Sequence, residues 1–166
     1  MVTTSAVPTN KFPGGSFLLE ERQPGDIFTP EDFSEQHQLI LQTTDEFARN
    51  EILPNAEKIE HKDFSVSREL LKKAADLGLS SVDIPEAYGG MEMDKVTSAI
   101  IGDRVAVYAG FATTWGGHTG IGTLPIVYFG TEQQKRKYLP RLASGEIVGA
   151  YALSEASSGS DACAPR

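Results

Sequence analysis

The chain has 166 residues and a net charge of −8, and 40% of its residues are hydrophobic and 23% are charged, which is the composition of one ordinary folded domain. The acidic balance argues against a nucleic-acid or anionic-membrane partner, because such partners need a basic surface. The single cysteine, Cys163, excludes an intramolecular disulfide and a zinc site built from cysteines, and it fits a reducing, cytoplasmic location.

The acidic charge is concentrated near the start of the chain. Residues 20–63 hold 12 acidic and 4 basic side chains, whereas the rest of the chain is balanced. This pattern favours a solvated acidic face on the first helices, with a docking surface for a basic partner as the alternative. No apolar run reaches the roughly 18 residues of a spanning helix, and the first 20 residues lack the features of a secretory or mitochondrial leader. We therefore predict no membrane-spanning segment.

The first predicted elements are an irregular lead-in and two helices. Prolines and glycines interrupt every candidate element in residues 1–28. Thr29 and Pro30 can begin a helix, whose apolar residues recur at helical spacing until Pro54 ends or kinks it. A second helix is predicted over residues 68–77, with Gly78 as its C-terminal stop.

The next segments alternate between turns and helices. Residues 80–90 predict an extended piece and a turn, and Asp94 can cap a helix that runs to about residue 108. Residues 111–129 are apolar enough for a buried helix but contain Gly116, Gly117, Gly120 and Gly122. Each glycine inside a helix costs about 1 kcal/mol relative to Ala, so the four need a reason, either close helix packing or space for a ligand.

The last predicted elements are a helix and a strand. Thr131 and Gln134 form a capping box that opens a helix to about residue 143. Residues 147–153 are apolar and compatible with a buried strand. A lone strand cannot satisfy its backbone groups, so we expect the chain to be an N-terminal fragment that stops inside a β-rich second domain.

The predicted fold class is mainly α. It comprises a lead-in of residues 1–28, a helical bundle domain of residues 29–146 and the truncated start of a β domain in residues 147–166. The predicted core consists of apolar residues on the inward faces of the helices: Phe33, Ile40, Phe47, Leu70, Leu71, Leu77, Ile100, Val127 and Leu139.

The segment most suggestive of chemistry is the Ser- and Gly-containing run of residues 151–161, which follows the predicted strand. Such loops offer free backbone N–H groups and hydroxyls that bind phosphate or the polar edge of a planar cofactor; a polar surface loop is the alternative. His37, His61 and His118 lack the spacing of metal ligands, so we predict no metal site and interpret them as surface or core residues.

Short motifs carry more information, and they follow one another in this order: Leu77-Gly78-Leu79, Ile84-Pro85-Glu86-Ala87-Tyr88-Gly89-Gly90, Phe129-Gly130-Thr131-Glu132-Gln133-Gln134-Lys135, Lys137-Tyr138-Leu139-Pro140, Leu142-Ala143-Ser144-Gly145-Glu146, Tyr151-Ala152-Leu153-Ser154-Glu155 and Gly159-Ser160-Asp161. With them, residues 28–161 resemble the N-terminal part of the acyl-CoA dehydrogenase family, and most closely its bacterial long-chain and very-long-chain members. The pattern departs from the family at Ala156, where Pro is usual, and at residues 163–166.

This resemblance implies a flavoenzyme with an N-terminal α-helical domain, a middle β domain and a C-terminal four-helix domain. Such enzymes use FAD to oxidise the Cα–Cβ bond of an acyl-CoA thioester in fatty-acid β-oxidation. A Glu of the C-terminal domain removes the α-proton, so no catalytic residue is assigned in this chain. Electron-transfer flavoprotein as acceptor and a homo-oligomeric enzyme are also implied. The alternatives are a non-enzymatic helical interaction module and another flavoenzyme of the superfamily, such as an acyl-CoA oxidase.

The resemblance also assigns site residues. The FAD site would be lined by Tyr151, Leu153, Ser154, Gly159 and Ser160. Ser154 stands where Thr is usual and keeps the hydroxyl, and Ser160 would also contact the CoA ligand. Gly116 and Gly120 are four residues apart and therefore share a helix face. There they would leave room for a long acyl tail, with tight helix packing as the alternative.

Overall fold

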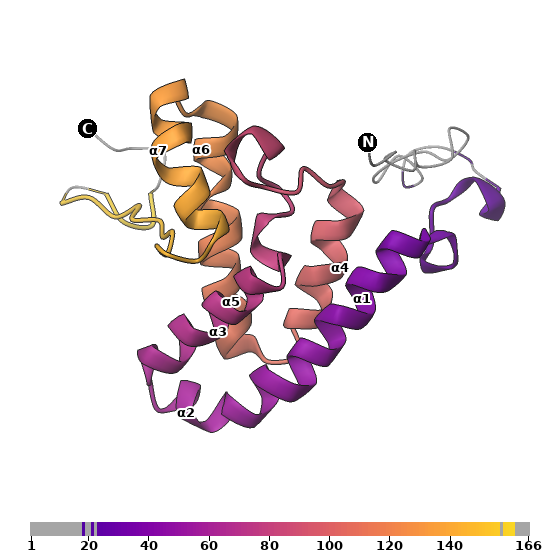
Figure 1. Ribbon diagram of the computed structural model, residues 1–166, viewed down its shortest axis with the longest axis horizontal. Coiled ribbons are helices and arrows are strands. Elements are labelled where there is room, and N and C mark those ends of the chain that lie inside the picture. Colours follow the sequence, from indigo (N-terminus) through magenta and orange to yellow (C-terminus); the bar gives the residue numbers. More distant parts are fainter. Residues whose placement is uncertain (1–17, 19–20, 22, 157, 162–166) are drawn as a thin grey trace. The chain divides into compact units, whose positions relative to one another are not determined.

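The structure is a computed structural model that describes residues 18, 21, 23–156 and 158–161 (Figure 1). The chain divides into two compact units, Met1–Leu39 and Ile40–Arg166, which are taken in turn. The α-helices of the described residues are α1 (Glu35–Phe47), α2 (Ala56–Glu60), α3 (Phe64–Asp76), α4 (Lys95–Val105), α5 (Ala109–Gly116), α6 (Leu124–Phe129) and α7 (Glu132–Ala143). These residues form no β-strand, so the predicted mainly α class is confirmed.

The first unit contains the start of α1. The predicted cap at Thr29 opens only a short 3₁₀ turn, Pro30–Asp32, in which the Thr29 N–H donates to the Asp32 carboxylate at 2.9 Å. Phe33 then adopts an extended ψ of 129°, so α1 begins at Glu35. The helix therefore starts later than the sequence pattern predicts. Most of the predicted lead-in lies outside the described residues.

The second unit begins within α1, and the chain changes geometry around Pro54. A π-helical turn, Ala48–Ile52, is followed by a 3₁₀ turn, Leu53–Asn55, and then by α2. Proline lacks an N–H and its ring clashes with the carbonyl four residues back, so a regular α-helix cannot pass through it. The predicted break at Pro54 is confirmed.

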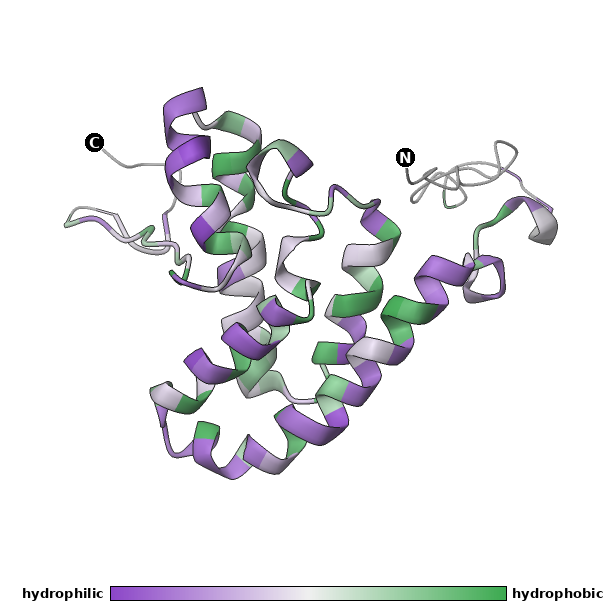
Figure 2. Ribbon diagram, viewed as in Figure 1, coloured by the Kyte–Doolittle hydropathy of each residue, from purple (hydrophilic) through white to green (hydrophobic). Residues whose placement is uncertain are grey.

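Helix α3 is amphipathic, with hydrophilic and hydrophobic positions alternating along it (Figure 2). Its buried residues include Leu70, Leu71 and Ala74. Gly78 has φ +79° and ends the helix in the left-handed conformation, as predicted. The prediction that Leu77 is in the core is wrong, because the helix ends at Asp76 and the Leu77 side chain is 49% exposed; Leu79 enters the core instead.

The main core surrounds α5, which packs against α2, α3 and α4. The ring of Phe111, which is fully buried, lies 6.4 Å from that of Phe47 and 6.5 Å from that of Trp115. A second apolar cluster joins Ile84 to the inner face of α7, and Val127 packs against it. Of the predicted core residues, Phe47, Leu70, Leu71, Ile100 and Leu139 are buried, whereas Phe33, Ile40 and Val127 are half-buried.

Residues 79–93 fold back on themselves rather than forming the predicted extended piece. The N–H of Met91 donates to the Ser81 carbonyl at 3.0 Å, and that of Met93 donates to the Val82 carbonyl at 2.7 Å. Asp94 then caps α4 as predicted, because its carboxylate accepts the Thr97 N–H at 2.9 Å. This loop brings Ile84 into the second apolar cluster beside α7.

Helix α7 begins with the predicted capping box. The Thr131 N–H donates to Gln134 Oε1 at 2.8 Å, and the Gln134 N–H donates to Thr131 Oγ1 at 3.3 Å. Thr131→Ala removes the acceptor for one of the unpaired N–H groups of the helix start, so we expect the free energy of unfolding to fall by about 1 kcal/mol. Thr131→Ser keeps the hydroxyl and is the matched control. Equal denaturation midpoints for the two variants would contradict the cap.

The strand predicted over residues 147–153 is wrong. These residues run as irregular backbone, and no partner strand lies in the described part of the chain. Strand geometry needs a neighbour to pair its N–H and C=O groups. Here the Ile147 N–H donates to the Arg141 carbonyl at 3.2 Å instead. Val148, Tyr151 and Leu153 are 42%, 57% and 42% exposed.

Candidate functional site

The glycine-rich segment after α5 is a π-helical turn, η8 (Gly117–Gly122), which separates α5 from α6. Hydroxyl groups satisfy carbonyls around this wider turn: Thr119 donates to the Trp115 carbonyl at 3.0 Å, and Thr123 donates to the His118 carbonyl at 2.7 Å. π turns inside helices often occur at functional sites. The single helix predicted over residues 111–129 is therefore two helices joined by η8.

The glycines of this segment serve two different purposes. A Cβ atom at Gly116, Gly117 or Gly120 would meet no heavy atom within 4 Å, so helix packing does not require glycine there. At Gly122 a Cβ atom would lie 2.6 Å from the Gly149 carbonyl carbon and 2.8 Å from the Ala150 nitrogen. Gly122 therefore permits the close approach of residues 149–150, while the space beside Gly116 and Gly120 is open.

His118 lies in η8, is 1% exposed and is hydrogen-bonded to a segment 31 residues later in the chain. Its Nδ1 accepts the Gly149 N–H at 3.1 Å. Burial lowers the pKa of His118 from its ordinary value, and the Leu142 backbone opposes this effect only partly. The sequence interpretation of His118 as a surface or core residue does not predict this connection; a lone histidine within an apolar, glycine-rich segment is the available signal.

The predicted cofactor loop leaves the helices just after Gly149. Tyr151, Leu153, Ser154, Gly159 and Ser160 are all exposed, and among the described residues no hydrogen bond occupies the hydroxyls of Ser154 and Ser160. The backbones of Glu155 and Ser158 exchange two hydrogen bonds, of 2.8 and 3.2 Å, which close a turn. The loop therefore begins directly after Gly149, the residue that contacts η8.

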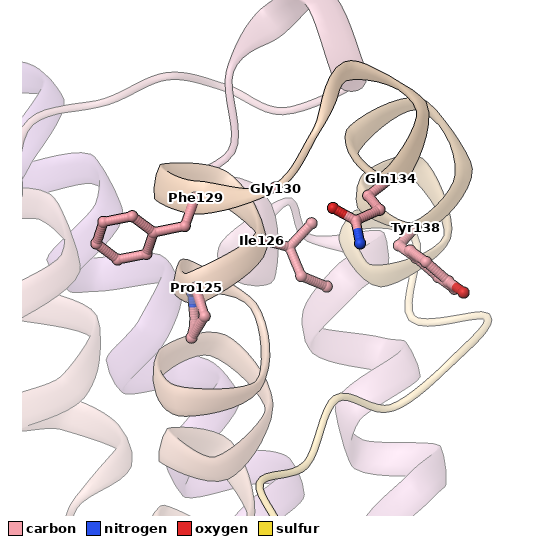
Figure 3. Close-up of a pocket in the computed structure, with 6 residues that line it drawn as sticks. All are labelled: Pro125, Ile126, Phe129, Gly130, Gln134 and Tyr138. Carbon is pink, nitrogen blue, oxygen red and sulfur yellow. The ribbon is translucent and has the colours of Figure 1, made fainter.

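A separate apolar pocket of about 300 Å³ lies between α6 and α7. Figure 3 shows Ile126 of α6 directed towards Gln134 and Tyr138 of α7, while the Phe129 ring extends to the other side of α6. Pro125 and Gly130 complete the lining. None of the residues assigned from the sequence lines this pocket.

The described residues contain no group of three or more His, Cys, Asp and Glu side chains placed to hold a metal ion. None of their helices has the length and hydropathy needed to cross a bilayer.

Comparison with known proteins identifies the family. The sequence profile described as "Acyl-CoA dehydrogenase, N-terminal domain" matches residues 34–146. The chain belongs to the acyl-CoA dehydrogenase family. The probable acyl-CoA dehydrogenase of Bacillus subtilis (strain 168) is 49% identical over 149 residues, which are 90% of this chain and 25% of that protein.

Two solved structures are also similar to this chain. The crystal structure of the acyl-CoA dehydrogenase complexed with FAD from Bacillus anthracis is 54% identical, with a TM-score of 0.83, over 90% of this chain and 26% of that one. A chain of the electron transferring flavoprotein structure of Acidaminococcus fermentans is 32% identical, with a TM-score of 0.68, over 80% of this chain and 35% of that one. This chain therefore spans about a quarter to a third of the length of these relatives.

Proposed function

We propose that this chain is the N-terminal part of a FAD-dependent acyl-CoA dehydrogenase, in which residues 29–146 are the helical domain and residues 147–166 begin the β domain. The observation that carries the proposal is the similarity to the Bacillus anthracis enzyme complexed with FAD, which extends over 90% of the chain. The matches do not favour a non-enzymatic interaction module.

The loop of residues 151–161 has the chemical character that a flavin needs. FAD supplies the acceptor for the hydride that leaves the β-carbon of the substrate. The Ser154 hydroxyl would donate to the polar edge of the flavin ring, and the Ser160 hydroxyl would bind phosphate oxygens of FAD and CoA. Space at the Gly159 Cβ position, where no heavy atom lies within 4 Å, lets the backbone approach a ligand closely. Tyr151 and Leu153, which are exposed in this chain, would cover the ring.

The open face of Gly116 and Gly120 would form one wall of the acyl pocket. The backbone there carries no side chain and faces space free of heavy atoms within 4 Å, so a long acyl tail could lie along it. We therefore propose a preference for long acyl chains. Burial of each additional methylene contributes about 0.8 kcal/mol to binding.

The partners follow from the same proposal. Electron-transfer flavoprotein is the proposed acceptor, supported by the similarity to a chain of the Acidaminococcus fermentans structure. The complete enzyme is proposed to be a cytoplasmic homo-oligomer. The matches do not favour an acyl-CoA oxidase, which would pass its electrons to O₂ rather than to a flavoprotein.

The test uses a chimera in which this chain replaces the matching quarter of the Bacillus subtilis relative. Purified chimera should carry FAD, measured as flavin absorbance per polypeptide. Ser154→Ala and Ser160→Ala should each weaken FAD binding by about 1–3 kcal/mol, because each leaves a buried polar group of the cofactor without its partner.

Ser144→Ala is the matched control, because Ser144 is exposed at the end of α7 and its hydroxyl donates to the Arg141 carbonyl. This variant should retain its flavin. Unchanged flavin content and unchanged rate in both loop variants would contradict the assignment of the loop. The 166-residue chain alone should bind FAD weakly and show no turnover.

A further inference from the structure

A single side chain accepts the last hydrogen bond that joins the helices to the segment leading into the predicted flavin loop. Among the described residues, no hydrogen bond joins residues 150–156 or 158–161 to any helix. The last hydrogen bond before this stretch is donated by the Gly149 N–H to His118 Nδ1, at 3.1 Å. His118 is 1% exposed, so water does not compete for this bond.

The imidazole has a defined tautomer in this arrangement. Nδ1 accepts a hydrogen bond and therefore carries no proton, so the proton of the neutral imidazole is on Nε2. Close contact reinforces the arrangement, because the Cβ position of Gly149 lies 3.2 Å from the His118 carbonyl oxygen and 3.1 Å from the Gly122 carbonyl carbon. Two segments, η8 and residues 147–150, thus meet at His118.

We propose that His118 is a positioning residue that, as the neutral Nε2–H tautomer, fixes residues 147–150 on the helical domain and thereby sets where the flavin loop begins. The inference rests on the proposed function for the part that concerns FAD. His118 touches neither substrate nor cofactor in this role; it acts through the Gly149 backbone.

Protonation of His118 would undo this arrangement. The imidazolium would direct an Nδ1–H at the Gly149 N–H, so two donors would face each other. α5, η8 and α6 carry no Asp, Glu, Lys or Arg, and the charged groups where α7 ends, Arg141 and Glu146, pair with each other at 2.8 Å. Burial lowers the pKa of His118, so the folded protein keeps the neutral imidazole below the ordinary pKa. The contribution of this form to stability is complete above the ordinary pKa and is lost as the pH falls from there through the lowered pKa, where His118 becomes protonated.

The test compares three variants of the 166-residue chain by NMR. His118→Asn keeps an acceptor near the Nδ1 position, His118→Gln places its amide near the Nε2 position, and His118→Leu removes both. We expect the Gly149 amide to exchange about tenfold faster in the Gln and Leu variants and within about twofold of wild type in the Asn variant. The protection of Gly149 should fall in acid in the wild type and not in the Asn variant.

The same variants in the chimera test the effect on the cofactor. FAD affinity should fall about tenfold for His118→Gln and recover for His118→Asn. Equal protection of the Gly149 amide from hydrogen exchange in the wild type, the Gln variant and the Leu variant would overturn the proposed role of the His118–Gly149 hydrogen bond. Loss of this protection with unchanged FAD affinity would overturn the positioning role. A wild-type chimera that binds no FAD would overturn the proposed function and the flavin part of the inference. The NMR result would still show whether the His118–Gly149 hydrogen bond holds residues 147–150 on the helical domain.

Discussion

Replacing Phe111 by Ala should lower the free energy of unfolding by about 3–5 kcal/mol, because the ring is completely buried and its removal leaves a cavity that the surrounding helices cannot fill. Phe111 lies on α5, against which α2, α3 and α4 pack, and its ring contacts those of Phe47 and Trp115. A loss of this size is a large fraction of the 5–15 kcal/mol that stabilises an ordinary domain. Chemical denaturation followed by circular dichroism measures it.

Phe129→Ala is the matched control, because it removes the same side chain from a position that is 86% exposed. Its free energy of unfolding should stay within about 0.5 kcal/mol of the wild-type value. Similar losses for the two variants would mean that α5 is not the centre of the core.

Replacing Gly120 by Gln in the chimera should reduce kcat/KM for long-chain acyl-CoA far more than for short-chain acyl-CoA. The new side chain would occupy the open space beside η8, where we propose that the acyl tail lies. Exclusion of about three methylenes forfeits about 2.4 kcal/mol, which corresponds to a roughly fiftyfold loss for a long chain. A short chain that does not reach the glycine should lose little. Gly116→Gln should act in the same direction.

Gly102→Gln provides the matched control. Gly102 lies inside α4, and a Cβ atom there would also meet no heavy atom within 4 Å. This variant introduces the same side chain into a helix to which we assign no contact with the acyl tail, so its chain-length preference should equal that of the parent. Equal losses for short and long substrates in the Gly120 variant would show that the glycine does not border the acyl tail.

Helix ends that depend on a single capping residue can be predicted from the local sequence. Gly78 ends α3 in the left-handed conformation, Asp94 caps α4, and Thr131 with Gln134 caps α7. Each depends on neighbours within three or four residues, so the chain specifies it locally. Leu77 was misplaced because its periodicity matched the inner face of α3, while the helix ends one residue earlier.

Features that depend on distant segments could not be predicted. The π turn η8 interrupts an apolar run whose composition suits a regular helix. The hydrogen bond between His118 of this turn and Gly149 joins residues that are 31 positions apart. The expected strand needs a partner that no described residue supplies. The site residues of the loop follow from the resemblance alone, because residues 151–156 have no hydrogen bond to the helices that would position them.

The central proposal is that this chain is the N-terminal part of an active acyl-CoA dehydrogenase. The most direct test is whether an acyl-CoA substrate reduces the bound flavin. Purified chimera is mixed with palmitoyl-CoA without oxygen, and the flavin absorbance is followed. We predict that the oxidised flavin band disappears upon mixing and returns when electron-transfer flavoprotein is added. A folded, FAD-loaded chimera whose spectrum is unchanged by short-, medium- and long-chain acyl-CoA would contradict the proposed function.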